Sequence, residues 1–386
     1  MSTLYEIIKD EFDKRGYVKV PGLLERFSIS IGCHIFKQVN LKKKTFFHGG
    51  STENFRNHII MMSPSGYGRS MLFRLFLDEE SGFLSRTDSL PTNITATFSP
   101  ESWMGTAYKY EGEIKTTKGV FGEFKEGIVG ADEYMKIKKL MDGTGVENEE
   151  VYLMTALDYD KVDKKLSLHK IREEGIGTTF WCGMRPSQIT LTSGLARRFS
   201  FQIFFPTLQD ARKFKLANRN KEMKKKISSE TLENIDIEIA RLVEEIKTLS
   251  EINYSGVNSW VNGNEYIPHF EETIFRRLGL GWGVANGTPG DIKVDDTLKS
   301  IFKDELKSRW IIRTDPIKEA IFNVIEAGDT EPGKIERTKL LLFARAHYQM
   351  HVYKIHNAIS TLIMEDRIKE SCGILQVKKG NSMFNN

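Results

Sequence analysis

The sequence has 386 residues, of which 40% are hydrophobic and 28% charged, and its formal net charge at pH 7 is +4. This composition is typical of a soluble globular chain of two or three domains, and it excludes a disordered or strongly polycationic protein. No apolar run reaches the roughly 18 residues needed to cross a bilayer, the N-terminus lacks a signal-peptide pattern, and three scattered cysteines predict neither disulfides nor a zinc site. We therefore expect a cytoplasmic or nucleoid-associated protein without membrane contact.

Residues 1–50 are predicted to form a helical lead-in. Apolar residues recur at helical spacing over the first dozen residues and again over residues 23–39. Gly16 and Pro21 interrupt the pattern between these two segments. The stretch is too short for a domain of its own, so we expect it to lead into the larger domain that follows.

Residues 59–75 have the pattern of a strand, a glycine-containing loop and a helix. The loop residues are Ser63, Pro64, Ser65, Gly66, Tyr67, Gly68, Arg69 and Ser70. In a phosphate loop of pattern G-x-x-x-x-G-K-[ST], the backbone N–H groups and the helix N-terminus hold a polyphosphate. Here Ser63 replaces the first glycine and Arg69 the lysine, whereas Ser70 keeps the hydroxyl that would bind Mg²⁺. An ordinary strand-to-helix turn is the alternative explanation of this stretch.

A second predicted strand ends in two adjacent acids, Asp132 and Glu133, roughly sixty residues after the loop. In a nucleotide-hydrolysing site, the first carboxylate holds the water shell of Mg²⁺, and the second orients and deprotonates the attacking water. Paired acids also occur on surface turns, so this hypothesis depends on the phosphate loop.

β-rich runs begin near residues 58, 93, 127, 178 and 200, with helical segments between most of them and a charged hairpin over residues 157–171. This alternation predicts an α/β fold with a mainly parallel sheet, helices on both faces and ligands at the carboxyl ends of the strands. We assign the core to residues 51–206 and a helical lid to residues 207–290.

The last segment, residues 291–386, is predicted to contain linker helices and a winged helix-turn-helix. Its helices over residues 335–347 and 352–364 are followed by a short hairpin, which is the order of that motif. From residue 331 onward there are nine Lys or Arg and five Asp or Glu, so this segment alone accounts for the net charge of +4. Residues 212–226 form a second basic run. A solvated helical face and a binding patch are the two interpretations of this run.

The order of these motifs resembles that of an AAA+ ATPase: phosphate loop, acidic strand end, charged hairpin, polar strand end, and Leu195-Ala196-Arg197-Arg198-Phe199. The hairpin before the fourth strand resembles that of the pre-sensor-hairpin group. Ser30-Ile31-Gly32-Cys33-His34-Ile35-Phe36-Lys37, which leads to Gly49-Gly50, is similar to the start of the ATPase module of minichromosome maintenance (MCM) helicases. The likeness covers roughly residues 25–285 and implies a P-loop AAA+ core, a helical lid and a C-terminal winged helix.

The resemblance also implies roles for three arginines. Arg198 takes the position of an arginine finger, which reaches the γ-phosphate bound by a neighbouring subunit and requires a homo-oligomeric ring, expected to be a hexamer. Arg277 takes the position of the lid arginine that contacts the phosphate. Arg185 stands at the strand end where the family has an asparagine that positions water. Ordinary surface arginines are the alternative for Arg198 and Arg277.

DNA is the partner that the resemblance implies. Basic side chains of the hairpin would face the channel of the ring and neutralise phosphates, and further polar residues would contact DNA from the winged helix. The residues expected to bind DNA are Lys161, Lys164, Lys165, Lys354, His356, Asn357, Lys378 and Lys379. A solvated hairpin tip and a protein-binding winged helix are the alternatives.

The function expected from the sequence is that of an MCM-like DNA helicase or translocase in DNA replication, with ATP and Mg²⁺ as cofactors. Because Arg69 and Arg185 depart from the family pattern, slow or absent hydrolysis stays open. Two alternatives remain: an initiator that binds origin DNA and uses ATP only to assemble, and an ATPase that remodels a protein partner.

Overall fold

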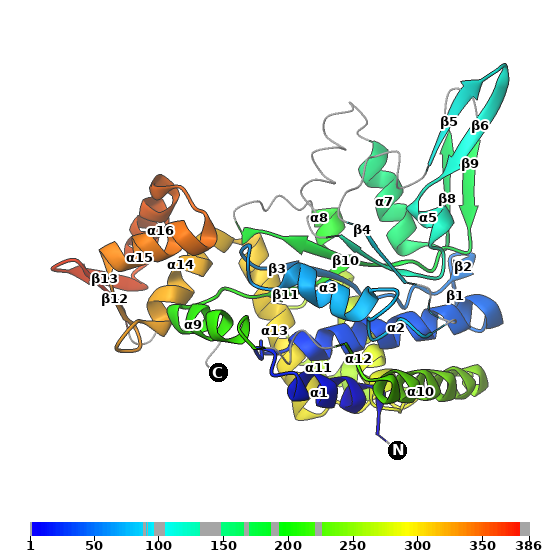
Figure 1. Ribbon diagram of the computed structural model, residues 1–386, viewed down its shortest axis with the longest axis horizontal. Helices are drawn as coiled ribbons and strands as arrows, with labels where there is room; N and C mark the ends of the chain where they lie inside the picture. Colours follow the sequence, from blue (N-terminus) through cyan, green and yellow to red (C-terminus); the bar gives the residue numbers. More distant parts are fainter. Residues whose placement is uncertain are drawn as a thin grey trace.

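The computed structural model describes residues 2–87, 90, 92–95, 105–131, 148–165, 170–186, 193–220 and 226–378. At its centre lies a five-stranded parallel sheet with the strand order β11-β3-β10-β7-β4 (Figure 1). The strands are β3 (His58–Met62), β4 (Thr92–Thr95), β7 (Ile128–Ala131), β10 (Thr179–Met184) and β11 (Phe199–Ile203). The predicted α/β class and parallel sheet are confirmed.

The strands form where short, continuous apolar runs occur, and strands β3, β7 and β10 are buried along their whole length. Such runs are typical of parallel sheets with both faces covered. The register aligns the ends of the neighbouring strands: Met184 pairs with Met62, and Phe199 pairs with His58. Residues that follow β3, β10 and β11 therefore lie at one edge of the sheet.

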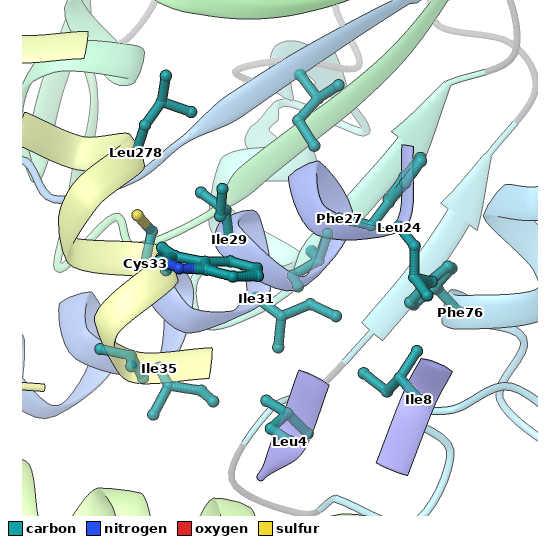
Figure 2. Packing of buried hydrophobic residues seen from close by; sticks show 14 of the residues in the cluster. Leu4, Ile8, Leu24, Phe27, Ile29, Ile31, Cys33, Ile35, Phe76 and Leu278 are labelled. Atoms are coloured by element: carbon teal, nitrogen blue, oxygen red, sulfur yellow. The ribbon is translucent and has the colours of Figure 1, made fainter. Parts of the chain in front are cut away.

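Alternate strand residues contribute to two separate cores. Ile59, Met61, Ile128 and Trp181 point into the larger one, together with helices that precede the sheet, follow it, or connect β3 with β4. These helices are α1 (Leu4–Lys14), α2 (Leu23–Lys43), α3 (Arg69–Leu77), α10 (Ser229–Thr248), α11 (Ser255–Asn262), α12 (Glu272–Ala285) and most of α13 (Asp296–Arg313). Figure 2 shows the labelled apolar residues of α2 between Leu278 on one side and Phe76 on the other, with Leu4 and Ile8 of α1 below them.

The opposite face of the sheet carries the second core, so the predicted helices on both faces are confirmed. Ile60, Met62, Phe180 and Phe201 belong to it, with side chains of flanking helices. The contributing helices are α5 (Val120–Glu123), α7 (Asn148–Asp158), α9 (Leu208–Ala217), α14 (Pro316–Ala327), α15 (Arg337–Tyr348) and α16 (Val352–Met364).

Helix α2 is the central helix of the larger core, not a peripheral part of a lead-in. Where it crosses α12, a Cβ atom on Gly32 would lie 2.4 Å from the carbonyl oxygen of Gly281, and one on Gly281 would lie 2.2 Å from the carbonyl oxygen of Ile29. Only glycine permits this approach, because real Cβ atoms do not come within 3.0 Å of a neighbour. The region expected to be a lid therefore lies mostly beneath the sheet, where α12 is packed on α2.

A buried ion network connects α13 with the rest of the core. The carboxylate of Glu305 lies 2.5 Å from Nη1 of Arg26 in α2 and 2.9 Å from Nε of Arg309 one turn later. It also accepts a hydrogen bond from the Phe201 N–H of β11, at 3.1 Å. Paired in this way, buried charges hold α2, α13 and β11 in one arrangement.

Two antiparallel hairpins project from the sheet on the same side of the molecule (Figure 1). The charged hairpin expected from the sequence is confirmed as β8 (Lys161–Lys165) and β9 (Lys170–Glu174), although its first expected residues, 157 and 158, belong to α7. The second hairpin, β5 (Gly105–Tyr110) and β6 (Glu113–Lys118), was not predicted. A small hairpin, β1 (Phe47–His48) and β2 (Ser51–Thr52), precedes β3.

The C-terminal module comprises residues 316–378. It contains α14, α15 and α16 and a three-stranded antiparallel sheet in the order β12-β14-β13. The strands are β12 (Lys334–Glu336), β13 (Ile368–Ser371) and β14 (Ile374–Val377), so the two predicted helices and the hairpin after them are confirmed. Arg367 ties β13 to α14 through two hydrogen bonds to the Glu319 carboxylate.

The remaining short elements are α8 (Ser193–Ala196) and the 3₁₀ helix His269–Glu271. In the part of the chain that the structure describes, no helix combines the length and the apolar character that a membrane span requires.

Candidate functional site

Strand β3 runs directly into the loop formed by residues 63–70, as predicted. The N–H of Ser63 donates to the carbonyl of Met184 at 3.1 Å, and the N–H of Phe204 donates to the carbonyl of Met62 at 2.8 Å. The loop is thereby attached to the ends of both strands that flank β3. After β3 the chain crosses to β4 at the far edge of the sheet, returns through β7 and β10, and then passes β3 to form β11 on its other side. The order of strands therefore reverses at β3.

The shape of the loop depends on two glycines. Gly66 and Gly68 have φ values of 86° and 81°, in the left-handed region that favours glycine. Gly68 precedes α3, and no side chain caps the N-terminus of this helix. The first N–H groups of α3 therefore have no side-chain acceptor at the cap, and they face the place where a bound anion would lie.

A cavity of about 410 Å³ opens beside the loop. One wall consists of residues 65–70 and Arg185, and the facing wall is largely apolar. The facing residues come from the α1–α2 segment and from α9: Phe12, Tyr17, Val18, Val20, Leu23, Phe214, Ala217 and Asn218. This volume and this division into polar and apolar walls are typical of small-molecule sites. Of the expected lid, the described residues contribute only α9 and its C-cap to the cavity.

Arg69 and Ser70, at the start of α3, have different surroundings. Arg69 is only 9% exposed, and its Nη1 donates to the carbonyl of Ser63 at 3.1 Å, so the guanidinium closes the loop on itself. Ser70 is exposed at the cavity wall, where its hydroxyl can bind a cation. Buried Ser63 Oγ has no hydrogen-bond partner among the described residues. The backbone of the loop can thus accommodate a polyphosphate, and Arg69 has a structural role within the loop.

Arg185 is brought to this site, as expected from its position after β10. It lines the cavity, and its Nη1 donates to Oε1 of Gln349 at 3.3 Å. A positive charge therefore lies beside the loop, at the carboxyl end of the neighbouring strand.

The two acids expected to complete the site, Asp132 and Glu133, lie outside the described residues. Their strand is described: β7 ends at Ala131, which pairs with Cys182 of β10. Since β10 separates β7 from β3, the end of β7 is two strand spacings, about 10 Å, from β3.

Arg277, expected to be a lid arginine at the phosphate, does not lie at the loop of its own chain, and its contact with a phosphate bound by another copy stays a prediction. Its Nε donates to the carbonyl of Asn54 at 3.1 Å, upstream of β3, and burial lowers its pKa. The five residues of β3 separate this end of the sheet from the loop by about 16 Å. Its position in α12, which is packed on α2 beneath the sheet, accounts for the difference.

Arg198 lies at this same end of the sheet. It precedes Phe199, which pairs with the first residue of β3, and it is 8% exposed. Its Nε donates to Asp158 at 2.8 Å, and its Nη1 donates to the carbonyl of Gly194. Arg198 therefore cannot reach the loop of its own chain; the expected contact with the loop of a neighbouring chain is untested.

Sequence reasoning missed a buried cationic cluster beside these arginines. Lys37 donates to the carbonyl and hydroxyl of Thr52 and to the carbonyl of Glu53, and burial with the nearby Arg56 lowers its pKa to about 7. Arg56 is fully buried, donates to four oxygens of Asn54, Leu157, Tyr159 and Thr178, and has its pKa lowered to about 9 by burial. These cations attach α2 and β3 to the loops at the amino end of the sheet.

The residues expected to bind DNA are dispersed over two regions. Lys161 is exposed on β8; Lys164 and Lys165 follow on the same strand, paired with Ile171 and Lys170.

In the C-terminal module, Asn357 is exposed on α16 and Lys354 half-buried. His356 Nδ1 lies 2.7 Å from an Arg337 nitrogen, and Lys378 is paired with Asp366. Lys379 lies outside the described residues. Of this set, His356 and Lys378 are engaged within the chain.

The unpredicted hairpin β5–β6 carries exposed aromatic side chains. Tyr108 and Tyr110 are 46% and 50% exposed, and Lys115 Nζ lies 4.3 Å from the centroid of the Tyr110 ring. Glu111 and Gly112 form its tight turn, both with positive φ. The Glu111-Gly112 turn between two runs with β-forming residues is the sequence signal that could have revealed this hairpin.

Comparisons of the sequence with protein-family models and with curated proteins found no match. Among the described residues, no three His, Cys, Asp or Glu side chains gather in a way that could hold a metal ion. The functional assignment therefore depends on the geometry of the loop and its cavity.

Proposed function

We propose that this chain binds ATP with Mg²⁺ at residues 63–70 and couples it to work on DNA, as an oligomeric AAA+ ATPase resembling the MCM helicases. The observation that carries this proposal is the loop: a glycine-containing turn after a buried interior strand, opening on a helix N-terminus without a side-chain cap. Backbone N–H groups arranged in this way bind phosphate oxygens.

The position of the loop in the fold supports the same proposal. In open α/β sheets, ligands bind outside the carboxyl ends of strands where the strand order reverses, and β3 stands at that point. The cavity beside the loop has room for a nucleoside, and its apolar wall, which includes Val18, Val20 and Phe214, suits a planar base. Mg²⁺ would be held by Ser70 and Asp132 and would neutralise charge on the phosphates.

DNA association is supported by the two hairpins. Both project on the same side of the sheet (Figure 1), and they carry exposed lysines beside the aromatic rings of Tyr108 and Tyr110. Aromatic side chains stack on bases without regard to sequence, and lysines neutralise the backbone. We infer that the hairpins form the DNA-contacting surface and that the C-terminal module, as a winged helix, adds a second contact.

Assembly into a ring is supported by the distance between the loop and the arginine pair. Arg198 and Arg277 lie at the sheet end away from the loop, so only a second copy of the chain can bring either one to a bound triphosphate. We propose a homo-oligomeric ring, with a hexamer as the expected size.

The first test is equilibrium binding of a fluorescent ATP analogue with Mg²⁺. We expect Ser70→Ala to weaken Mg²⁺-dependent binding several-fold, and Ser259→Ala, which removes an exposed serine of α11, to leave it unchanged. Glu133→Gln should abolish turnover and preserve binding. Absence of nucleotide binding by the unaltered chain would contradict the proposal.

A second candidate, an initiator that uses ATP only to assemble, is favoured by one observation. Arg69 is buried and bonded to Ser63, where a phosphate loop ordinarily has a lysine that can follow the phosphates. ATPase rates with and without DNA, combined with strand displacement, separate the two. Stimulated hydrolysis with unwinding supports the motor, whereas ATP-dependent DNA binding without turnover supports the initiator.

A further inference from the structure

The C-terminal end of α15 contacts the phosphate loop, although about 280 residues separate them in sequence. The hydroxyl of Tyr67 is 2.8 Å from Nδ1 of His347. Burial raises the pKa of Tyr67 and lowers that of His347, so both groups are neutral near pH 7. The hydrogen bond therefore connects two uncharged groups in a partly dry interface.

Tyr67 is the buried residue between Gly66 and Gly68, the two glycines of the loop with positive φ. It is 5% exposed, and its ring centroid lies 5.1 Å from that of Phe214 and 6.0 Å from that of Phe204. A Cβ atom on Gly66 would meet no atom within 4 Å. Side-chain packing thus holds the loop at Tyr67, whereas the space beside Gly66 is open.

His347 is itself held in place. Its ring stacks on Phe343 one turn earlier, with centroids 4.4 Å apart and an interplanar angle of 28°. The next residue, Tyr348, donates its buried hydroxyl to the carbonyl of Pro206 at 2.9 Å, and Gln349 accepts from Arg185. Three consecutive residues of one helix end therefore reach the phosphate loop, the end of β11 and the end of β10.

We propose that His347 is a positioning residue for the phosphate loop, which it orders through Tyr67. The hydrogen bond limits the loop's freedom at its centre, and the N–H groups on either side are then already oriented when an anion arrives. Ordering the loop in advance lowers the entropic cost of binding. The effect on nucleotide affinity rests on the proposed function, but the ordering of the loop does not.

The first experiment needs no ligand. Hydrogen exchange of peptides covering residues 63–70 is measured in the full chain and in Tyr67→Phe, His347→Ala and Tyr348→Phe. We expect the first two variants to exchange faster in this segment. Tyr348→Phe is the matched control, because it removes a buried hydroxyl bond of the same interface without touching the loop. Equal exchange in all four proteins would overturn the proposal.

The second experiment measures the affinity for the fluorescent ATP analogue. We expect Tyr67→Phe and His347→Ala each to weaken binding about fivefold, the effect of losing one ordinary hydrogen bond. The affinity of the double variant should be no lower than that of the single variant that binds less tightly, because both changes remove the same hydrogen bond. His347→Asn, which keeps a polar atom near the position of Nδ1, should recover part of the affinity.

The two experiments distinguish the failure of this inference from the failure of the proposed function. An unaltered chain that binds no nucleotide contradicts the proposed function, and hydrogen exchange still decides whether His347 orders the loop. If Tyr67→Phe, His347→Ala and the double variant all bind nucleotide as tightly as the unaltered chain, the positioning role of His347 is overturned. The proposed function is then not affected.

Discussion

His34 is fully buried in α2, and both ring nitrogens have partners. Its Nδ1 is 2.9 Å from Thr179 Oγ1, and its Nε2 is 3.0 Å from the carbonyl of Glu126. Burial lowers the pKa of His34 to about 3, and it lowers that of His58, in β3, well below the ordinary value. His34 is thus a neutral hydrogen-bonding group between α2 and the sheet, and His58 is one between β3, the carbonyl of Leu157 and the N–H of Phe180. A charge at either position would be expensive to bury.

At the residue scale, we expect these histidines to make the fold sensitive to acid. Between pH 6.5 and about 3, the unfolded chain binds one more proton at His34 than the folded chain does. The free energy of unfolding therefore falls as pH falls through this window, by at most about 1.4 kcal/mol per pH unit for one site.

Urea unfolding between pH 4 and 7 measures this slope. His34→Gln keeps polar atoms but cannot ionise. In this variant, the slope of the unfolding free energy against pH should be smaller by the amount that corresponds to one proton. An identical slope in both proteins would show that His34 is already protonated in the folded state.

The buried carboxylate of Glu305 has a different role, because it is charged and paired. We expect Glu305→Ala to destabilise the protein by about 3–5 kcal/mol, since it leaves Arg26 and Arg309 without their shared partner in a dry core. Glu244→Ala, which removes the exposed partner of Lys247 on α10, should change stability little. Chemical unfolding compares the two variants, and equal effects would mean that water reaches the Glu305 site.

At the scale of elements, the crossing of α2 and α12 is the closest helix contact described above. Backbone atoms of Gly32 and Gly281 face each other there, which lets the lid region lie flat beneath the sheet. Since α2 also covers Trp181 and Phe73 through Phe27, a change at this crossing would reach the sheet.

We expect Gly281→Ala to cost at least about 2 kcal/mol, because its Cβ atom would force the helices apart. Gly263→Ala is the control: this C-cap residue of α11 has a φ of −78°, and its nearest contacts for a Cβ atom are 3.5 and 3.6 Å. Thermal unfolding should therefore show a large shift for the first variant and a small one for the second. Similar small shifts would mean that the helices can separate without loss of packing.

At the scale of the whole molecule, the two ends of the parallel sheet carry different chemistry. The carboxyl end carries the loop, its cavity and the contact with α15, and the amino end carries the buried cations and Arg198. Asp158 engages Arg198 within the chain, so a role for Arg198 in a neighbouring site requires this pair to open or rearrange.

This arrangement predicts complementation between variants. Arg69→Ala impairs the loop of its own chain, and Arg198→Lys keeps a positive charge for Asp158 but loses the planar fork of arginine. Each variant alone should hydrolyse ATP poorly. Mixing them should restore part of the activity, since some interfaces then combine an intact loop with an intact arginine. Activity no greater than the sum of the separate variants would contradict a shared site.

The local features of this protein could be predicted from sequence. Continuous apolar runs identified β3, β7 and β10, and helical periodicity identified α10, α12 and the C-terminal helices. The hairpin β5–β6 was missed, because its residues are mixed polar and aromatic with little contrast between its two faces. The distance of Arg277 from the loop of its own chain was not foreseen, because a motif assigns a residue to a helix but does not say along which side of the sheet that helix packs.

The amino-acid sequence by itself determined where strands and helices form and where the backbone turns at Gly66 and Gly68, because these features depend on neighbours a few residues away. Only the tertiary structure decided that Tyr67 meets His347, that Arg198 is held by Asp158, and that Arg277 lies at the far end of the sheet. Those contacts depend on strand order and on how helices pack on the two faces of the sheet. Local periodicity leaves both of these open.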